Sequence, residues 1–295
     1  SILPQAIANP LAAQALERIP IARFDQFCSE LPARMLKSVS RRLGFLHDSS
    51  VARAVVERWI GPNGFLGNFR ILDNNGYQIL NNIAPVWPGL ILEKIESDFV
   101  GVGFEVEGYY DRWARLIKAI GYDADAFERA VVLLSRFAYL ERENSNVNSA
   151  RSCLSGFFHM YLSGTQAPPS QRREVIRRLS ASSDVELREG ALLAVRSLLK
   201  SDSFMSFERH DFGARSRDWG WYPKGDGEIA EWFKESISLA VEVMSEPEAR
   251  RVLSGSMRRL WHYPSCRILL QEVASMFILN APGTEAWISC GSVLR

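Results

Sequence analysis

The chain has 295 residues, of which 47% are hydrophobic and 23% are charged, values typical of globular proteins rather than disordered chains. Its 35 Lys and Arg residues nearly balance its 34 Asp and Glu residues, so no overall field attracts it to nucleic acid or anionic lipid. No apolar run reaches the roughly 18 residues that a membrane span needs, and the first residues lack the pattern of a signal peptide. We therefore expect a cytoplasmic protein with no membrane partner.

Helix signals dominate the first 72 residues. Asn9 and Pro10 predict the start of a helix, because Asn caps helices and Pro suits the first helical position. Further helices are predicted over residues 20–31, from residue 32, and from the capping residues 48–50 to a Gly-rich turn at 61–64. We interpret residues 1–72 as an N-terminal helical segment.

Residues 73–295 continue with helices that come in pairs and carry apolar residues at i, i+3, i+4 and i+7. Residues 183–186 and 245–248 have the capping-box pattern of a helix start. No segment alternates convincingly as a strand does, although residues 99–106 come closest. The sequence predicts an all-α fold.

Helix–turn–helix units recur at about 40 residues, near the spacing of HEAT-like and armadillo-like arrays. We predict that the paired antiparallel helices of residues 73–295 stack as a right-handed solenoid of that kind, because one unit cannot bury its apolar face alone. A non-repetitive helical domain is the alternative.

The four cysteines are far apart and none forms a C-x-x-C pair, so we expect buried free thiols. The four histidines are scattered, and the pair His262 and Cys266 lacks the third ligand of a zinc site. The sequence predicts neither a metal nor a cofactor.

Catalytic motifs are absent. Asp211-Phe212-Gly213 spells the metal-binding triplet of protein kinases, but the chain has neither a Gly-rich phosphate loop nor an H-R-D loop. It also lacks G-x-x-x-x-G-K-[ST] and G-x-S-x-G. We therefore predict no catalytic residue.

The most unusual segment covers residues 210–223, where arginines, aspartates and aromatic residues surround two glycines. Ordinary loops consist mainly of Gly, Pro, Asn, Asp and Ser. The arginines could pair with the aspartates while the aromatic rings fill a gap between helix pairs, or the segment could be an interface hot spot. Both interpretations remain open. The residues predicted to bind a partner are Asp211, Arg215, Arg217, Asp218, Trp219, Trp221 and Tyr222.

A basic helix is the second candidate for binding. Its arginines cover one broad face, which suits phosphate contacts. We favour a solvated face instead, because Glu174 offsets the charge and no aromatic residue interleaves for base stacking. Nucleic acid is therefore a candidate partner but not the favoured one. The residues are Arg172, Arg173, Arg177 and Arg178.

Three short patterns lie between about residues 75 and 245 and carry a family resemblance. They are Ile83-Ala84-Pro85-Val86-x-Pro88, Leu162-Ser163-Gly164-Thr165-x-Ala167-Pro168 and Phe212-Gly213-Ala214-Arg215-x-Arg217-Asp218-x-Gly220. Together they resemble the helical C-terminal region of large bacterial STAND-type NTPases, some of which act as antiviral sensors. The resemblance implies that residues 1–72 are the tail of an upstream helical or winged-helix module, and that the rest is a sensing or autoinhibitory solenoid. The NTPase motifs themselves are absent.

Because the chain begins without Met, we expect it to be a piece of a longer protein, and the resemblance implies that this protein is bacterial. The favoured function is a non-catalytic interaction or sensor module that recognises a protein partner or autoinhibits an upstream NTPase or effector of the same polypeptide. The alternative is a HEAT-like enzyme of the alkylated-base DNA glycosylase type, which would need a basic groove. An architectural spacer is the third option.

Overall fold

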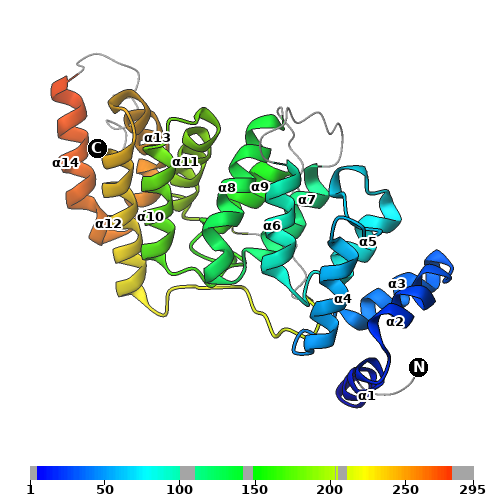
Figure 1. The fold of residues 1–295 in the computed structure, drawn as a ribbon. Helices are drawn as coiled ribbons and strands as arrows, with labels where there is room; N and C mark the ends of the chain where they lie inside the picture. The colour runs from blue at the N-terminus through cyan, green and yellow to red at the C-terminus, as the bar shows by residue number, and fades with distance from the viewer. Residues whose placement is uncertain (1–4, 100–109, 142–148, 203, 205–210, 281–295) are drawn as a thin grey trace. The chain divides into compact units, whose positions relative to one another are not determined.

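The computed structural model describes residues 5–99, 110–141, 149–202, 204 and 211–280. This part of the chain contains fourteen α-helices, two short 3₁₀ turns and no strand (Figure 1). The prediction of an all-α chain is confirmed. Of the strand candidate at residues 99–106, only Phe99 is described, and it ends a helix. His210 lies outside the described residues.

The chain divides into two compact units. The first consists of residues 1–108 and 209–218, and the second of residues 109–208 and 219–295. The unusual segment is therefore shared, since residues 211–218 belong to the first unit and residues 219–223 to the second. The boundary at residue 72 and the solenoid arrangement stay predictions.

Sequence signals for helix starts place most elements of the first unit. Pro20 and Pro32 precede α2 and α3, and the Ser49 hydroxyl accepts a hydrogen bond from the Ala52 amide at the start of α4. Helix α3 packs against α5, whereas α4 contacts α1, α2 and α6. The elements are α1 (Gln5–Glu17), α2 (Ile21–Ser29), α3 (Ala33–Leu43), α4 (Ser50–Ile60), η1 (Phe69–Ile71), α5 (Asn74–Ile83) and α6 (Pro88–Phe99).

The predicted helix start at Asn9 and Pro10 is wrong. Helix α1 already begins at Gln5, and Pro10 lies inside it, where it cannot donate a backbone hydrogen bond. The Asn9 side chain does not cap the helix; its Oδ1 accepts a hydrogen bond from Nη1 of Arg42 at 3.1 Å. A contact to a distant helix therefore replaces the local role that the sequence suggested.

The second unit is a succession of helices that pack on their neighbours. Helix α8 contacts α7, α9 and α11, and α10 contacts α11 and α12, which lie side by side in Figure 1. The Phe127 ring meets Phe157 and Phe158 edge-on in the core. The elements are α7 (Tyr110–Ile120), α8 (Ala124–Leu140), α9 (Ala150–Phe157), α10 (Pro169–Ser180), α11 (Val185–Leu198), α12 (Asp226–Val243), α13 (Glu246–Leu260), η2 (Pro264–Cys266) and α14 (Arg267–Asn280).

The cysteine prediction holds for the described part of the chain. Cys28, Cys153 and Cys266 are buried free thiols. Burial raises the pKa of the Cys28 thiol to about 11, with a smaller contribution from the Asp25 carboxylate. None of the described helices combines the length and apolarity needed to cross a membrane.

Candidate functional site

Residues 211–218 are fixed to the first unit by close backbone contacts. Gly213 has a φ of +63°, and a Cβ atom there would lie 2.2 Å from the carbonyl oxygen of Gly44. Nε of Arg215 donates a hydrogen bond to the Pro85 carbonyl at 2.9 Å. The Arg217 guanidinium lies 3.9 Å from the ring centroid of Phe212, which is buried. These contacts give Arg215 and Arg217 bracing roles, whereas their pairing with Asp211 and Asp218 stays a prediction.

Residues 219–223 are fixed to the second unit in a similar way. The Gly164 amide donates to the Trp219 carbonyl at 3.0 Å, and the Trp221 amide donates to the Thr165 carbonyl at 2.7 Å. Gly220 lies between them with a φ of +85°, and a Cβ atom there would lie 2.4 Å from the Thr165 carbonyl oxygen. Only glycine combines that conformation with so close an approach. The backbone on both sides of Gly220 is therefore held in place.

Arg172 of α10 is completely buried beneath this segment. Its Nε donates to the Ala167 carbonyl at 2.9 Å, Nη1 donates to the His159 carbonyl at 2.9 Å, and Nη2 donates to the Ser163 hydroxyl at 3.1 Å. These acceptors tie α10 to the preceding loop of residues 159–167. The prediction of four arginines on one accessible face needs correction here, because Arg172 has no exposed surface.

Two stacked tryptophans lie beside the buried guanidinium. The centroids of the Trp221 and Trp232 rings each lie 5.6 Å from the Arg172 guanidinium carbon, and the indole planes are 16° apart. Burial lowers the pKa of Arg172 to about 9, so the side chain stays charged at neutral pH. Trp221 is therefore part of the support and is only partly exposed.

The other three predicted phosphate-contacting arginines are accompanied by carboxylates. Arg177 makes a bidentate contact with Glu242 at 2.8 and 3.0 Å, and the Arg178 guanidinium lies 2.6 Å from Glu128. Arg173 lies 4.0 Å from Glu235. Hydrogen bonding from Arg177 lowers the pKa of the Glu242 carboxyl. These carboxylates offset the positive charge of α10 at three of its four arginines.

The outward-facing members of the segment are polar or aromatic. Asp211 and Asp218 are exposed in the first unit, while Trp219 and Tyr222 are 45% and 43% exposed in the second. The Lys224 ammonium lies 3.7 Å from the centroid of the Tyr222 ring. The structure therefore separates the seven predicted partner-binding residues into four that are exposed and three that are half-buried, Arg215, Arg217 and Trp221.

His159 lies next to this support and is unsuited to acid–base chemistry. Desolvation lowers the pKa of its imidazole to about 3, and the charges of Lys200, Lys118 and Arg172 act in the same direction. The ring is therefore neutral at physiological pH and packs edge-on against Phe204. Sequence reasoning missed the supporting role of the 159–167 loop, although Gly164, which has a φ of +67°, was visible in one of the family-like patterns.

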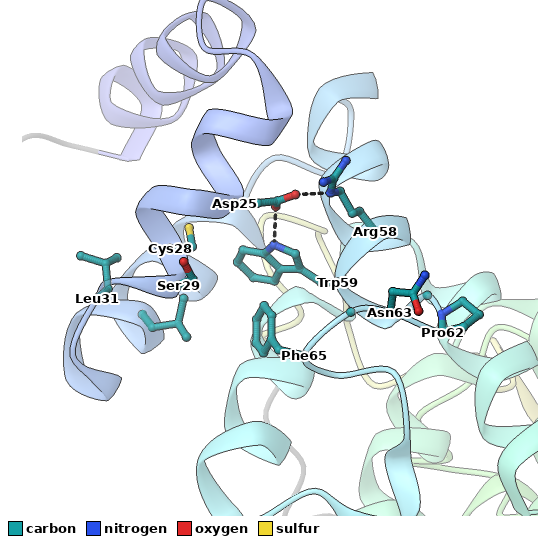
Figure 2. Close-up of a pocket in the computed structure, with 12 residues that line it drawn as sticks. Asp25, Cys28, Ser29, Leu31, Arg58, Trp59, Pro62, Asn63 and Phe65 are labelled. Atoms are coloured by element: carbon teal, nitrogen blue, oxygen red, sulfur yellow. Dashed lines mark hydrogen bonds and ion pairs between the residues drawn. The ribbon is translucent and has the colours of Figure 1, made fainter.

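A cavity of about 790 Å³ in the first unit was also missed (Figure 2). It lies beside α2, the end of α4 and the turn at residues 61–65. Oδ1 of Asp25 accepts a hydrogen bond from Nε1 of Trp59 at 3.1 Å, and Oδ2 of Asp25 forms an ion pair with Arg58. The Trp59 and Phe65 ring centroids are 5.0 Å apart. With the raised pKa of Cys28, the cavity offers an aromatic wall and no thiolate nucleophile at neutral pH.

Within the described ranges, no group of three His, Cys, Asp or Glu side chains is arranged to hold a metal ion. No protein-family model matches the chain, and neither a curated protein nor a solved structure matches it.

Proposed function

We propose that this chain is a non-catalytic helical interaction module of a larger bacterial protein, which recognises a protein partner through Trp219 and Tyr222. Exposed aromatic residues next to a polar rim are typical of interface hot spots. Both side chains are large, and a partner that covers them would bury apolar surface that now faces water.

One observation carries the proposal: the two exposed rings stand on a backbone that is already fixed. Backbone hydrogen bonds with Gly164 and Thr165 hold Trp219 and Trp221, the residues on either side of Gly220. Thr165 is itself anchored, because its hydroxyl donates to the Gly121 carbonyl at 2.9 Å. A partner would therefore meet a preformed surface and would not have to order a loop, which lowers the entropic cost of association.

The wider setting rests on the family resemblance. In this proposal the second unit, in which each helix packs on its neighbours, is part of a HEAT-like solenoid. The protein would be a cytoplasmic STAND-type NTPase with a role in antiviral defence, and partner binding would relieve autoinhibition of an upstream NTPase or effector. The glycosylase alternative has less support, because the arginines of α10 are either buried or paired with carboxylates.

The test compares three tagged versions of the protein purified under native conditions from its own host cells: wild type, W219S/Y222S and Y139S. Tyr139 on α8 is 45% exposed and provides a matched aromatic residue outside the segment. We expect a specific co-purifying protein to fall at least tenfold with W219S/Y222S and to be retained with Y139S.

Thermal unfolding of the same variants separates binding from folding. The W219S/Y222S and Y139S proteins should each melt within about 2 °C of the wild type, because substitutions of exposed residues rarely change stability much. Unchanged co-purification with W219S/Y222S, or a large fall in its melting temperature, would contradict the proposal.

A further inference from the structure

Helices α3 and α5 of the first unit line a second cavity, of about 360 Å³, which is open to solvent and has an unusual lining. Every residue around it can donate a side-chain hydrogen bond, and none carries a carboxylate. Such a lining suits an anionic ligand, since an anion accepts hydrogen bonds and a cation would find no negative side chain. The residues are Lys37, Ser38 and Arg41 from α3 and Tyr77, Gln78, Asn81 and Asn82 from α5.

Two positive charges lie one helical turn apart in this lining. Lys37 and Arg41 are at i and i+4 on α3, where like charges repel. Among the residues that the structure describes, neither forms an ion pair. On α10, by contrast, Arg177 and Arg178 both meet carboxylates. Within the described ranges, three arginines of the basic helix that the sequence singled out are accompanied by carboxylates, whereas Lys37 and Arg41 have no ion-pair partner.

The cavity is also preformed. Nδ2 of Asn82 donates to the Ser40 hydroxyl at 3.0 Å and to the Lys37 carbonyl at 3.3 Å, which fixes the lining of α5 against that of α3. At the end of α3 the backbones approach so closely that a Cβ atom on Gly44 would lie 2.0 Å from the Asn82 carbonyl oxygen. A ligand would thus meet a lining whose two helices are already held together.

We propose that this cavity binds the phosphate group of a nucleoside phosphate. Lys37 and Arg41 would contact the phosphate oxygens, the side-chain amides of Gln78 and Asn81 would add neutral donors, and the Tyr77 ring would offer a surface on which a base can stack. A volume of about 360 Å³ exceeds what phosphate alone would fill and lies at the lower end of small-ligand sites. The ligand is either a free nucleotide or one nucleotide of a single strand, and both present this chemistry.

The experiment titrates the protein with inorganic phosphate, AMP and a fluorescent ten-nucleotide oligodeoxythymidine at low salt. We expect saturable binding of AMP that is tighter than that of phosphate. K37Q/R41Q should weaken the binding of every probe at least tenfold. The matched control is R23Q/R34Q, which removes two exposed cations of the same unit that do not line the cavity, and which should change affinity less than threefold.

A second pair of variants tests whether the base of the nucleotide stacks on the Tyr77 ring. Y77L should weaken AMP at least fivefold without changing phosphate, whereas Y77F should retain AMP binding. Tighter binding of the oligonucleotide than of AMP, with a steep salt dependence, would identify a strand as the source, and binding of AMP alone would identify the free nucleotide.

The proposal is overturned if no probe binds saturably, if R23Q/R34Q weakens binding as much as K37Q/R41Q, or if K37Q/R41Q binds as the wild type does. Melting curves of K37Q/R41Q no lower than wild type show that any loss is not unfolding.

Discussion

The guanidinium of Arg172 lies 5.6 Å from the centroid of the Trp221 ring, so a buried cation supports the segment that carries Trp219 and Tyr222. Its hydrogen bonds go to two carbonyls and a hydroxyl of the 159–167 loop. That loop includes Leu162, whose φ of 56° is rare for a residue with a side chain. The arginine therefore joins a strained loop to the proposed binding surface within one unit.

Replacing Arg172 by Met should cost about 3 kcal/mol of unfolding free energy or more, because the buried carbonyls of Ala167 and His159 would lose their donors. Urea unfolding measures the loss. The matched control is R177M on the same helix, where the ion pair with Glu242 is exposed and its removal should cost less than about 1 kcal/mol. Equal effects at the two positions would show that Arg172 is not a structural centre.

Acidification should destabilise the protein through His159. The pKa of this imidazole falls from 6.5 to about 3 on folding, so the unfolded chain binds more protons between those values. The stability contributed by the neutral ring is complete above pH 6.5 and is lost as the pH falls, reaching a loss of about 2 kcal/mol at pH 5.

Urea unfolding at pH 7 and pH 5 checks this prediction. H159Q should lower stability at pH 7, because the contact with Phe204 is lost, but should show a smaller fall between the two pH values. H262Q, which removes an exposed histidine, is the control for the loss of a histidine as such. The same fall in H159Q as in wild type would assign the acid sensitivity to another group.

The sequence predicted the helices well because their signals are local. Ser49 caps α4 by accepting a hydrogen bond from the nearby Ala52 amide, and Pro20 and Pro32 directly precede α2 and α3. The predicted helix start at Asn9 was wrong, because the Asn9 side chain accepts a hydrogen bond from the distant Arg42 and does not cap a helix. The cap expected at Ser183 is one residue early, since Asp184 accepts from the Glu186 amide.

The position of Arg172 could have been predicted from the sequence. It precedes Val175, Ile176 and Leu179 at the i, i+3, i+4 and i+7 spacing that marks the buried face of a helix. Grouping it with Arg173 as part of a basic run ignored that periodicity. The cavity between α3 and α5 could not have been predicted from the sequence, because its two sides are about 40 residues apart and only tertiary packing brings them together.

Substitution of Gly220 by Ala should destabilise the second unit by about 2 kcal/mol or more. The residue has a φ of +85°, and the added Cβ would collide with the backbone of Thr165. G255A is the matched control, because Gly255 lies in the interior of α13 with nothing within 4 Å of its would-be Cβ, and alanine there should stabilise the helix by about 0.5–1 kcal/mol. Thermal unfolding distinguishes the two. A G220A protein as stable as wild type would show that the segment can relax away from residue 165.

We expect Arg215 to stabilise the fold and Trp219 to bind the partner, so substitutions at the two positions should have different effects. R215A removes the hydrogen bond to the buried Pro85 carbonyl and should cost about 1–2 kcal/mol, while W219S removes an exposed ring and should cost less than about 0.5 kcal/mol. Partner recovery should show the opposite order, because Trp219 belongs to the proposed contact surface of the second unit and Arg215 is anchored in the first. If W219S proves the more destabilising change and leaves partner recovery intact, the segment is a brace and its aromatic residues have no recognition role.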